Sequence, residues 1–134
     1  MNTKVLSSTA GATTVKAGIL HLVMTPNILN FSPNGAILFS VGGAAQIFWA
    51  VPMIRRWGRV WYSVGIGGTL VLIAIWTITR MPGSPITGRG AMVNEMGIAV
   101  EAMQWVFVDL TAAIIMTEYK MSAWTRRLRK IQDK

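Results

Sequence analysis

Four apolar stretches follow one another along the chain, separated by groups of turn-forming or basic residues. They cover about 9–26, 35–54, 60–79 and 95–117, and a helix needs about 20 apolar residues to cross a bilayer. Proline, glycine and asparagine are frequent in the first and third separating segments, whereas the second is a short turn rich in arginine. The pattern predicts an all-α integral membrane bundle of four transmembrane helices, with residues 1–134 forming a single domain.

The first stretch has the weakest apolar pattern of the four. It is rich in threonine and is interrupted by Lys16, whose ammonium group must reach toward the membrane surface if the segment crosses. A bundle of three transmembrane helices, with the N-terminus outside, is therefore the alternative.

Small residues occur in the middle of two of the stretches. Gly42 and Gly43 lie in the second, and Ser63 and Gly67 lie one helical turn apart in the third. Small side chains allow neighbouring helix backbones to approach closely in a membrane. The sequence therefore predicts two helix-packing surfaces.

The fourth stretch contains polar residues that an isolated transmembrane helix would avoid. At 100° per residue, Glu101, Gln104 and Asp109 fall on one side of a helix, opposite Ile98 and Ile114. An ionisable group at bilayer depth costs about 2.5 to 3.5 kcal/mol and normally faces a bundle interior or a wet cavity. We therefore predict that this stretch is the inner helix of the bundle.

Two interpretations of this polar side remain open. In the first, Glu101 and Asp109 form a path for protons or cations, with Gln104 between them. In the second, the same groups make internal hydrogen bonds that fix the register of the helices. The polar partners that the other stretches offer are His21, Gln46, Ser63 and Thr69.

The charges are distributed unevenly, with 13 Lys and Arg against 5 Asp and Glu and a net charge of +8. In a soluble protein this excess would suggest nucleic acid, but here the basic residues cluster at the ends of the apolar stretches. Because basic residues collect on the cytoplasmic side of membrane proteins, we expect both termini to be cytoplasmic, with a basic tail at 120–134. On the outer side, Arg80 or Arg89 could form an ion pair with Glu95.

The sequence contains no cysteine and a single histidine, His21. This composition excludes disulfides, thiolate metal sites and a cysteine nucleophile, and it leaves a metal site only as a mixed set of His21, Met24 and a carboxylate, which suits no metal especially well. The sequence has no Ser/His/Asp set, no paired acid and base and no nucleotide fingerprint. We therefore predict no catalytic residues, no metal and no cofactor.

Several short segments between Gly18 and about Gln104 resemble a broad family of small four-helix prokaryotic membrane proteins. They are HL at His21, GAILFSVGGAAQ, the pair Arg55 and Arg56, WTITRMPGSP and NEMGIAVE. The segments PGSPITGRG and VNE are also similar to what an accessory subunit of archaeal ammonia monooxygenase would contain. The resemblance implies a four-helix membrane protein and a non-catalytic role in that complex.

Two functional hypotheses follow. The first is a structural or accessory subunit that contacts the lipid bilayer and other membrane subunits or a second copy of itself. The alternative is a small oligomeric carrier of ions or protons that uses Glu101 and Asp109.

Overall fold

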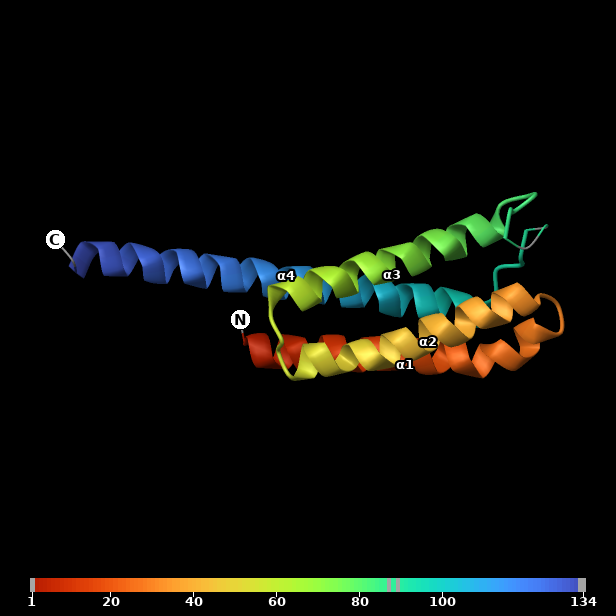
Figure 1. The fold of residues 1–134 in the computed structure, drawn as a ribbon, viewed down its shortest axis with the longest axis horizontal. Helices are drawn as coiled ribbons and strands as arrows, with labels where there is room; N and C mark the ends of the chain where they lie inside the picture. Colours follow the sequence, from red (N-terminus) through yellow and green to blue (C-terminus); the bar gives the residue numbers. More distant parts are fainter. Residues whose placement is uncertain (1, 87, 89, 133–134) are drawn as a thin grey trace.

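The protein forms a bundle of four long helices in the computed structural model, which describes residues 2–86, 88 and 90–132. The helices are α1 (Thr3–Leu29), α2 (Pro33–Ile54), α3 (Arg59–Arg80) and α4 (Glu95–Gln132). Figure 1 shows α1 beside α2 and α3 beside α4. The described residues contain no strand, so the all-helical prediction is confirmed.

Three of the described helices, α2, α3 and α4, are long and apolar enough to cross a membrane. The first helix, α1, is not among them, because Lys16 and its many hydroxyl groups lower its hydropathy. The four predicted stretches each fall within one of the four helices.

Polar side chains begin three of the helices. Asn2, Ser32 and Asn94 accept hydrogen bonds from the backbone N–H groups of Lys4, Gly35 and Gly97, at 3.1, 3.1 and 2.7 Å. These bonds satisfy N–H groups that have no partner inside a helix. The fourth start, before α3, uses Gly58 with a positive φ of 104°.

The first helix continues further than the sequence indicated. The sequence placed the end of this stretch at about residue 26, but α1 runs through Pro26 to Leu29 and ends within the run of turn residues that follows. A proline removes one helix hydrogen bond, but near the end of a helix the rest of the hydrogen-bond ladder is retained. The connection to α2 is therefore only Asn30 to Ser32.

The closest helix contact joins α1 to α2 at two glycines. A Cβ atom on Gly18 would lie 2.7 Å from the carbonyl oxygen of Gly43, and a Cβ on Gly43 would lie 2.8 Å from that of Gly18. Such distances leave no room for a side chain. The predicted packing role of Gly43 thus has a specific partner, and neighbouring Gly42 lies 3.0 Å, measured from its added Cβ, from Leu72 of α3.

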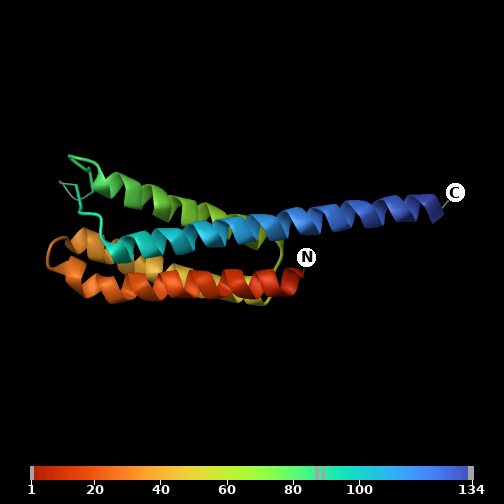
Figure 2. The ribbon, with the colours of Figure 1, turned by 180° about the vertical axis from the view of Figure 1, so that it is seen from behind.

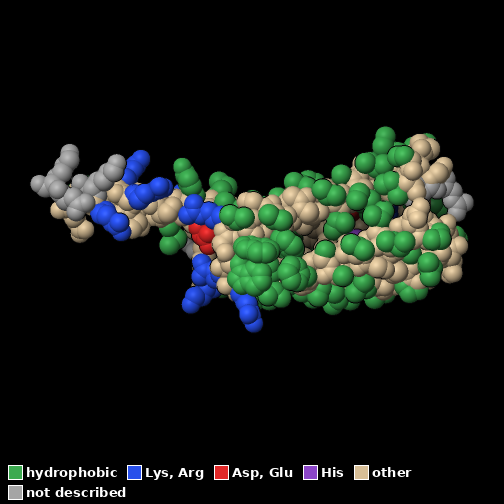
Figure 3. All heavy atoms as spheres, viewed as in Figure 1, with side chains coloured by type: hydrophobic (Ala, Val, Ile, Leu, Met, Phe, Trp, Pro, Cys, Tyr) green, Lys and Arg blue, Asp and Glu red, His purple; other side chains and the backbone are tan. Residues whose placement is uncertain are grey.

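The interior combines small and polar residues with a cluster of larger side chains, Met53, Tyr62, Phe107 and Ile114, and many other large apolar side chains face outward. The buried side of α1 consists of small and polar residues, namely Ser7, Ala10, Gly11, Thr14, Ala17, Gly18, His21 and Met24. On the outer side, Ile19, Val23, Val41, Val64 and Val71 are each about half exposed or more. Figure 3 shows these hydrophobic surfaces along the bundle, with Lys and Arg gathered at the end where both termini lie.

The third helix packs on α4 and makes few contacts with α2. The arginine-rich turn predicts that α2 and α3 form a helical hairpin, and they meet both at Gly42 and Leu72 and nearer the turn. There the indole of Trp49 lies directly on Gly65 and donates a hydrogen bond to the carbonyl of Trp61 at 3.1 Å.

The fourth helix is longer than the bundle. It continues without interruption through the predicted basic tail to Gln132, and Figure 2 shows this extension projecting beyond the other helices. The tail is therefore helical up to Gln132.

A glycine that contacts another helix and a glycine with open space beside it together test the packing of α1 on α2. Gly43→Ala is expected to destabilise the protein by about 1 to 3 kcal/mol, because the new methyl group meets the backbone of α1. Gly67→Ala is the matched control: no atom lies within 4 Å of its added Cβ, and alanine favours helix by up to about 1 kcal/mol. The unfolding midpoint in detergent measures both. Equal midpoints for the two variants would show that α1 and α2 do not meet at this point.

Candidate functional site

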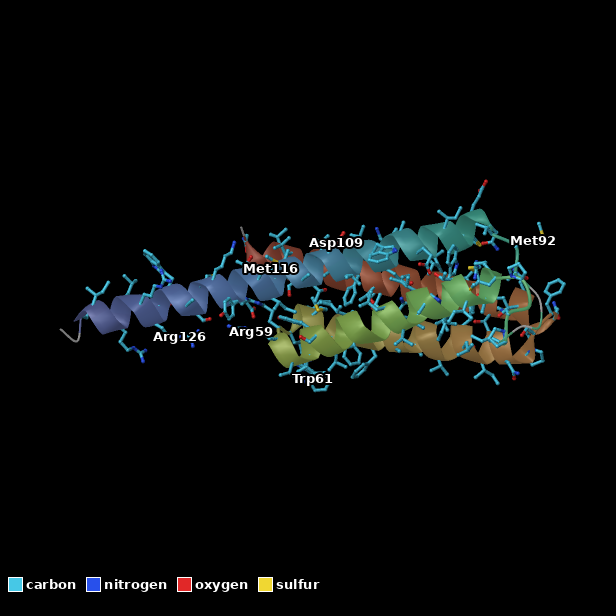
Figure 4. All side chains as sticks on the ribbon, turned by 90° about the horizontal axis from the view of Figure 1, so that it is seen from above. Arg59, Trp61, Met92, Asp109, Met116 and Arg126 are labelled. Atoms are coloured by element: carbon cyan, nitrogen blue, oxygen red, sulfur yellow. The ribbon has the colours of Figure 1, made fainter. Side chains whose placement is uncertain are left out.

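The structure separates the polar residues that the sequence placed on one side of α4. Glu101 and Gln104 are buried, as are His21 and Gln46 on the neighbouring helices. Asp109 is exposed. Figure 4 shows it on the side of α4 away from α3. The prediction of a single polar side is therefore wrong for Asp109.

The spacing of buried residues explains this difference. Val100, Gln104, Phe107, Thr111 and Ile114 are all buried, at intervals of three and four residues. Around the helix axis, the mean direction of these five side chains lies on the Gln104 side of Glu101 and is opposite to that of Asp109. Ile114, which the sequence analysis placed opposite the polar residues, is fully buried beside them. Thr111 was missed, although it lies two turns from Gln104 on the same line.

His21 occupies a defined place in this interior. Its Nδ1 donates to the carbonyl of Ala17 at 3.0 Å, because a carbonyl can only accept. The other ring nitrogen is left as an acceptor, and the side chain of Gln46 lies within hydrogen-bonding reach. Within the described residues, no three His, Cys, Asp or Glu side chains gather as metal ligands.

Several buried polar atoms lack a hydrogen-bond partner within the protein. They include the side-chain oxygens Oε1 of Gln46, Glu101 and Gln104, together with the hydroxyl groups of Thr111 and Tyr62. An unsatisfied buried group costs about 1 to 3 kcal/mol by soluble-protein values. We call these five buried residues the polar core.

A cavity of about 570 Å³ lies at the end of the bundle opposite the two termini. All four helices and the segment before α4 contribute to it. Its walls are mainly apolar, with His21 on one side and Trp76, Thr79 and Arg80 on the other. Figure 3 looks onto the hollow between α2 and α3.

Arg80 is held at this cavity by its own helix. Its guanidinium lies 4.1 Å above the ring of Trp76, and its Nη1 donates to the Trp76 carbonyl and to the Thr79 hydroxyl at 3.1 and 2.9 Å. No ion pair joins it to Glu95 among the described residues, so the predicted outer pair does not form there. The other predicted partner, Arg89, lies outside the described residues. The i, i+4 spacing of Trp76 and Arg80 could have indicated this contact.

The opposite end of the bundle has an ionic cluster that the sequence analysis missed. Glu118 lies 3.6 Å from Arg56 and 3.8 Å from Arg59, and Arg59 also donates to the Glu118 carbonyl and to Ser122, both at 3.2 Å. Arg56 reaches the hydroxyl of Thr3 at 3.1 Å. The turn between α2 and α3 is thereby connected to α1 and α4.

Comparisons of the chain with protein-family models, curated proteins and solved structures found no match. The classification of the described residues therefore rests on the structure itself, which is a helical bundle with three helices long and apolar enough to cross a membrane.

Proposed function

We propose that the chain is a multi-pass protein of the cell membrane, with four crossing helices and both termini cytoplasmic. The outward-facing apolar side chains and the polar core support this proposal. The 22 residues of α3, from Arg59 to Arg80, span about 33 Å, close to the thickness of the hydrocarbon layer. The close contact of α1 with α2 favours a crossing of both helices together.

The aromatic and basic residues at the turn between α2 and α3 fit the same arrangement. The rings of Trp57 and Trp49 pack against Trp61 with centroids 5.0 and 5.9 Å apart, beside Arg55 and Arg59. Tryptophan is enriched at membrane surfaces, and arginine on the cytoplasmic one. This turn and the C-terminal extension are therefore assigned to the cytoplasmic side.

We further propose that the protein is a non-catalytic accessory subunit of a larger membrane complex. The observation that carries this proposal is Asp109. Its side chain is exposed about halfway along the part of α4 that packs in the bundle, between the exposed apolar side chains of Trp105 and Met116. A carboxyl group facing lipid at that depth is expensive, and such groups normally have a protein partner. A hydrogen-bond donor on a neighbouring subunit would supply that partner.

The surface of α3 adds a second reason. The predicted packing residues Ser63 and Gly67 are exposed, and nothing lies within 4 Å of a Cβ atom added to Gly67 or Gly68. Small residues that no helix of this chain covers are suited to close contact with a helix of another chain. The resemblance described above extends the proposal to the ammonia monooxygenase complex of archaea.

A carrier of protons or cations is the second candidate, and the polar core is the observation that favours it. It contains unsatisfied oxygens on Gln46, Glu101, Gln104 and Thr111. Asp109 faces the other way, so within one protomer the route depends on Glu101 alone. If this candidate is correct, proton flux into proteoliposomes falls to background in Glu101→Gln, and wild-type flux in that variant rejects it.

The accessory role is tested by native purification of complexes that contain Asp109 variants. Asp109→Leu removes the carboxyl group and is expected to release the partner, whereas Asp109→Asn keeps hydrogen-bonding capacity and should retain part of it. Met116→Leu, a change of similar volume on the same exposed side, is the control and should retain the partner fully.

The partner recovered with the wild type, identified by mass spectrometry, also tests the assignment to ammonia monooxygenase. A folded wild-type protein that purifies from native membranes as a monomer without any partner would contradict the accessory role.

A further inference from the structure

A line of mostly exposed residues runs along α4 on the side away from the bundle, where Figure 4 shows Asp109. Its seven members follow one another at alternating intervals of four and three residues, and we call them the outer seam. They are Ile98, Ala102, Trp105, Asp109, Ala112, Met116 and Tyr119. At 100° per residue, their mean direction is about 150° from that of the buried residues of α4, so the other described helices leave the outer seam uncovered.

The spacing of the outer seam is the spacing of a coiled coil. Residues that alternate three and four apart repeat every seven, which keeps one line of side chains facing a partner helix along its whole length. Contact with lipid sets no such repeat, because lipid tails are as apolar as the side chains. The large side chains of Trp105 and Met116 are interspersed with Ala102 and Ala112, and these small residues leave space for the side chains of a second helix.

Asp109 occupies a defined position in this repeat. A parallel pair of identical helices places it opposite the same residue of the second helix, and the four residues that surround it there include Trp105 and Ala112. Trp105 lies one turn before Asp109, and its indole N–H is a hydrogen-bond donor. An identical helix therefore brings a donor to the carboxyl group of Asp109, and by symmetry it does so twice.

An identical helix also matches the outer seam in depth and in size. Two copies of a membrane protein with the same topology are related by an axis along the membrane normal, so each residue meets its counterpart at the same depth. The outer seam is about 32 Å long, and half the circumference of a helix is about 16 Å, which gives about 500 Å² per copy and about 1,000 Å² for the pair. That total reaches the size expected of a specific interface, about 1,000 Å².

We propose that two copies of the chain form a parallel dimer through the outer seam of α4, with Asp109 of each copy accepting a hydrogen bond from the Trp105 indole of the other. The inference rests on the proposed membrane crossing, and it names a second copy as the neighbouring subunit that Asp109 requires. A foreign helix with a basic residue opposite Asp109 would also satisfy the carboxyl group, but the outer seam of this chain already contains both the acceptor and the donor.

Disulfide crosslinking in the membranes of a host that expresses the full chain alone tests the contact. The chain has no cysteine, so Ala102→Cys and Ala112→Cys each introduce one thiol on the outer seam. Both variants are expected to form a crosslinked dimer on mild oxidation. Val106→Cys is the control and should stay monomeric, because Val106 is also exposed but lies about 90° around the helix from the outer seam. No dimer at either alanine, or a dimer that forms equally fast at Val106, would overturn the proposal.

The hydrogen bond is tested by fluorescence energy transfer between labelled copies in liposomes at a series of protein-to-lipid ratios. Trp105→Phe keeps the ring and removes the donor, so the dimer should weaken about eightfold, through the loss of two symmetric hydrogen bonds of about threefold each. Asp109→Leu removes the acceptor and should weaken the dimer at least as much. Trp124→Phe, at an exposed tryptophan outside the outer seam, is the control and should leave dimerisation unchanged. Wild-type dimerisation in both outer-seam variants would overturn the pairing of Asp109 with Trp105.

Failure of the dimer can be told apart from failure of the accessory role. If the two alanine positions do not crosslink while a foreign subunit is recovered with the wild type from native membranes, the dimer is rejected and the accessory role stands. If both positions crosslink but no foreign subunit is recovered, the dimer stands and the larger complex is rejected.

Discussion

The structure depends on the close approach of α1 and α2 at Gly18 and Gly43, where the two backbones leave no room for side chains. Two helices that touch backbone to backbone gain their contact area from small residues, and many of the larger apolar side chains point outward. That surface is stable only in surroundings as apolar as itself. Glu101 and Gln104 are buried in the interior, where ionisable and polar groups of membrane helices normally lie.

The two ends of the bundle have different chemistry. At one end, Glu118 connects the basic turn to α4. The rings of Trp57 and Trp61 pack together at this turn. At the other end, Arg80 has no carboxylate in direct contact and faces an apolar cavity. Between them, α4 presents Glu101 to the interior and Asp109 to the outside. One helix therefore supplies both the internal polar core and the polar group on the outer surface.

Much of the fold could be predicted from the sequence, because four apolar stretches with turn residues between them permit few other arrangements. The sequence did not predict which side of α4 faces the interior of the bundle. Glu101, Gln104 and Asp109 spread over about 140° around the helix, and the polar residues alone do not show which of them is left outside. Thr111 and Ile114 decide the direction, but an apolar residue such as Ile114 is equally acceptable facing lipid or facing protein.

The candidate site was less predictable than the fold. The cavity is lined by all four helices and the segment before α4, so it depends on how helices far apart in the sequence pack together. The sequence indicated Arg80 only as a possible ion-pair partner of Glu95. Its position depends on Trp76 one turn earlier and on the missing side chain of Gly97 on another helix.

The central claim, that the outer side of α4 faces lipid or a membrane partner while Glu101 faces inward, is tested most directly by single-cysteine labelling. The chain has no cysteine, so each substitution gives one unambiguous label. In liposomes, a spin label at Ala102, which is exposed beside Glu101, should be accessible to oxygen and shielded from a water-soluble relaxation agent, whereas a label at Thr125 should be accessible to that agent. In intact cells, an impermeant maleimide should react with a cysteine at Met92 and leave one at Thr125 unlabelled. Equal exposure of Ala102 and Thr125 to the water-soluble agent would contradict the account.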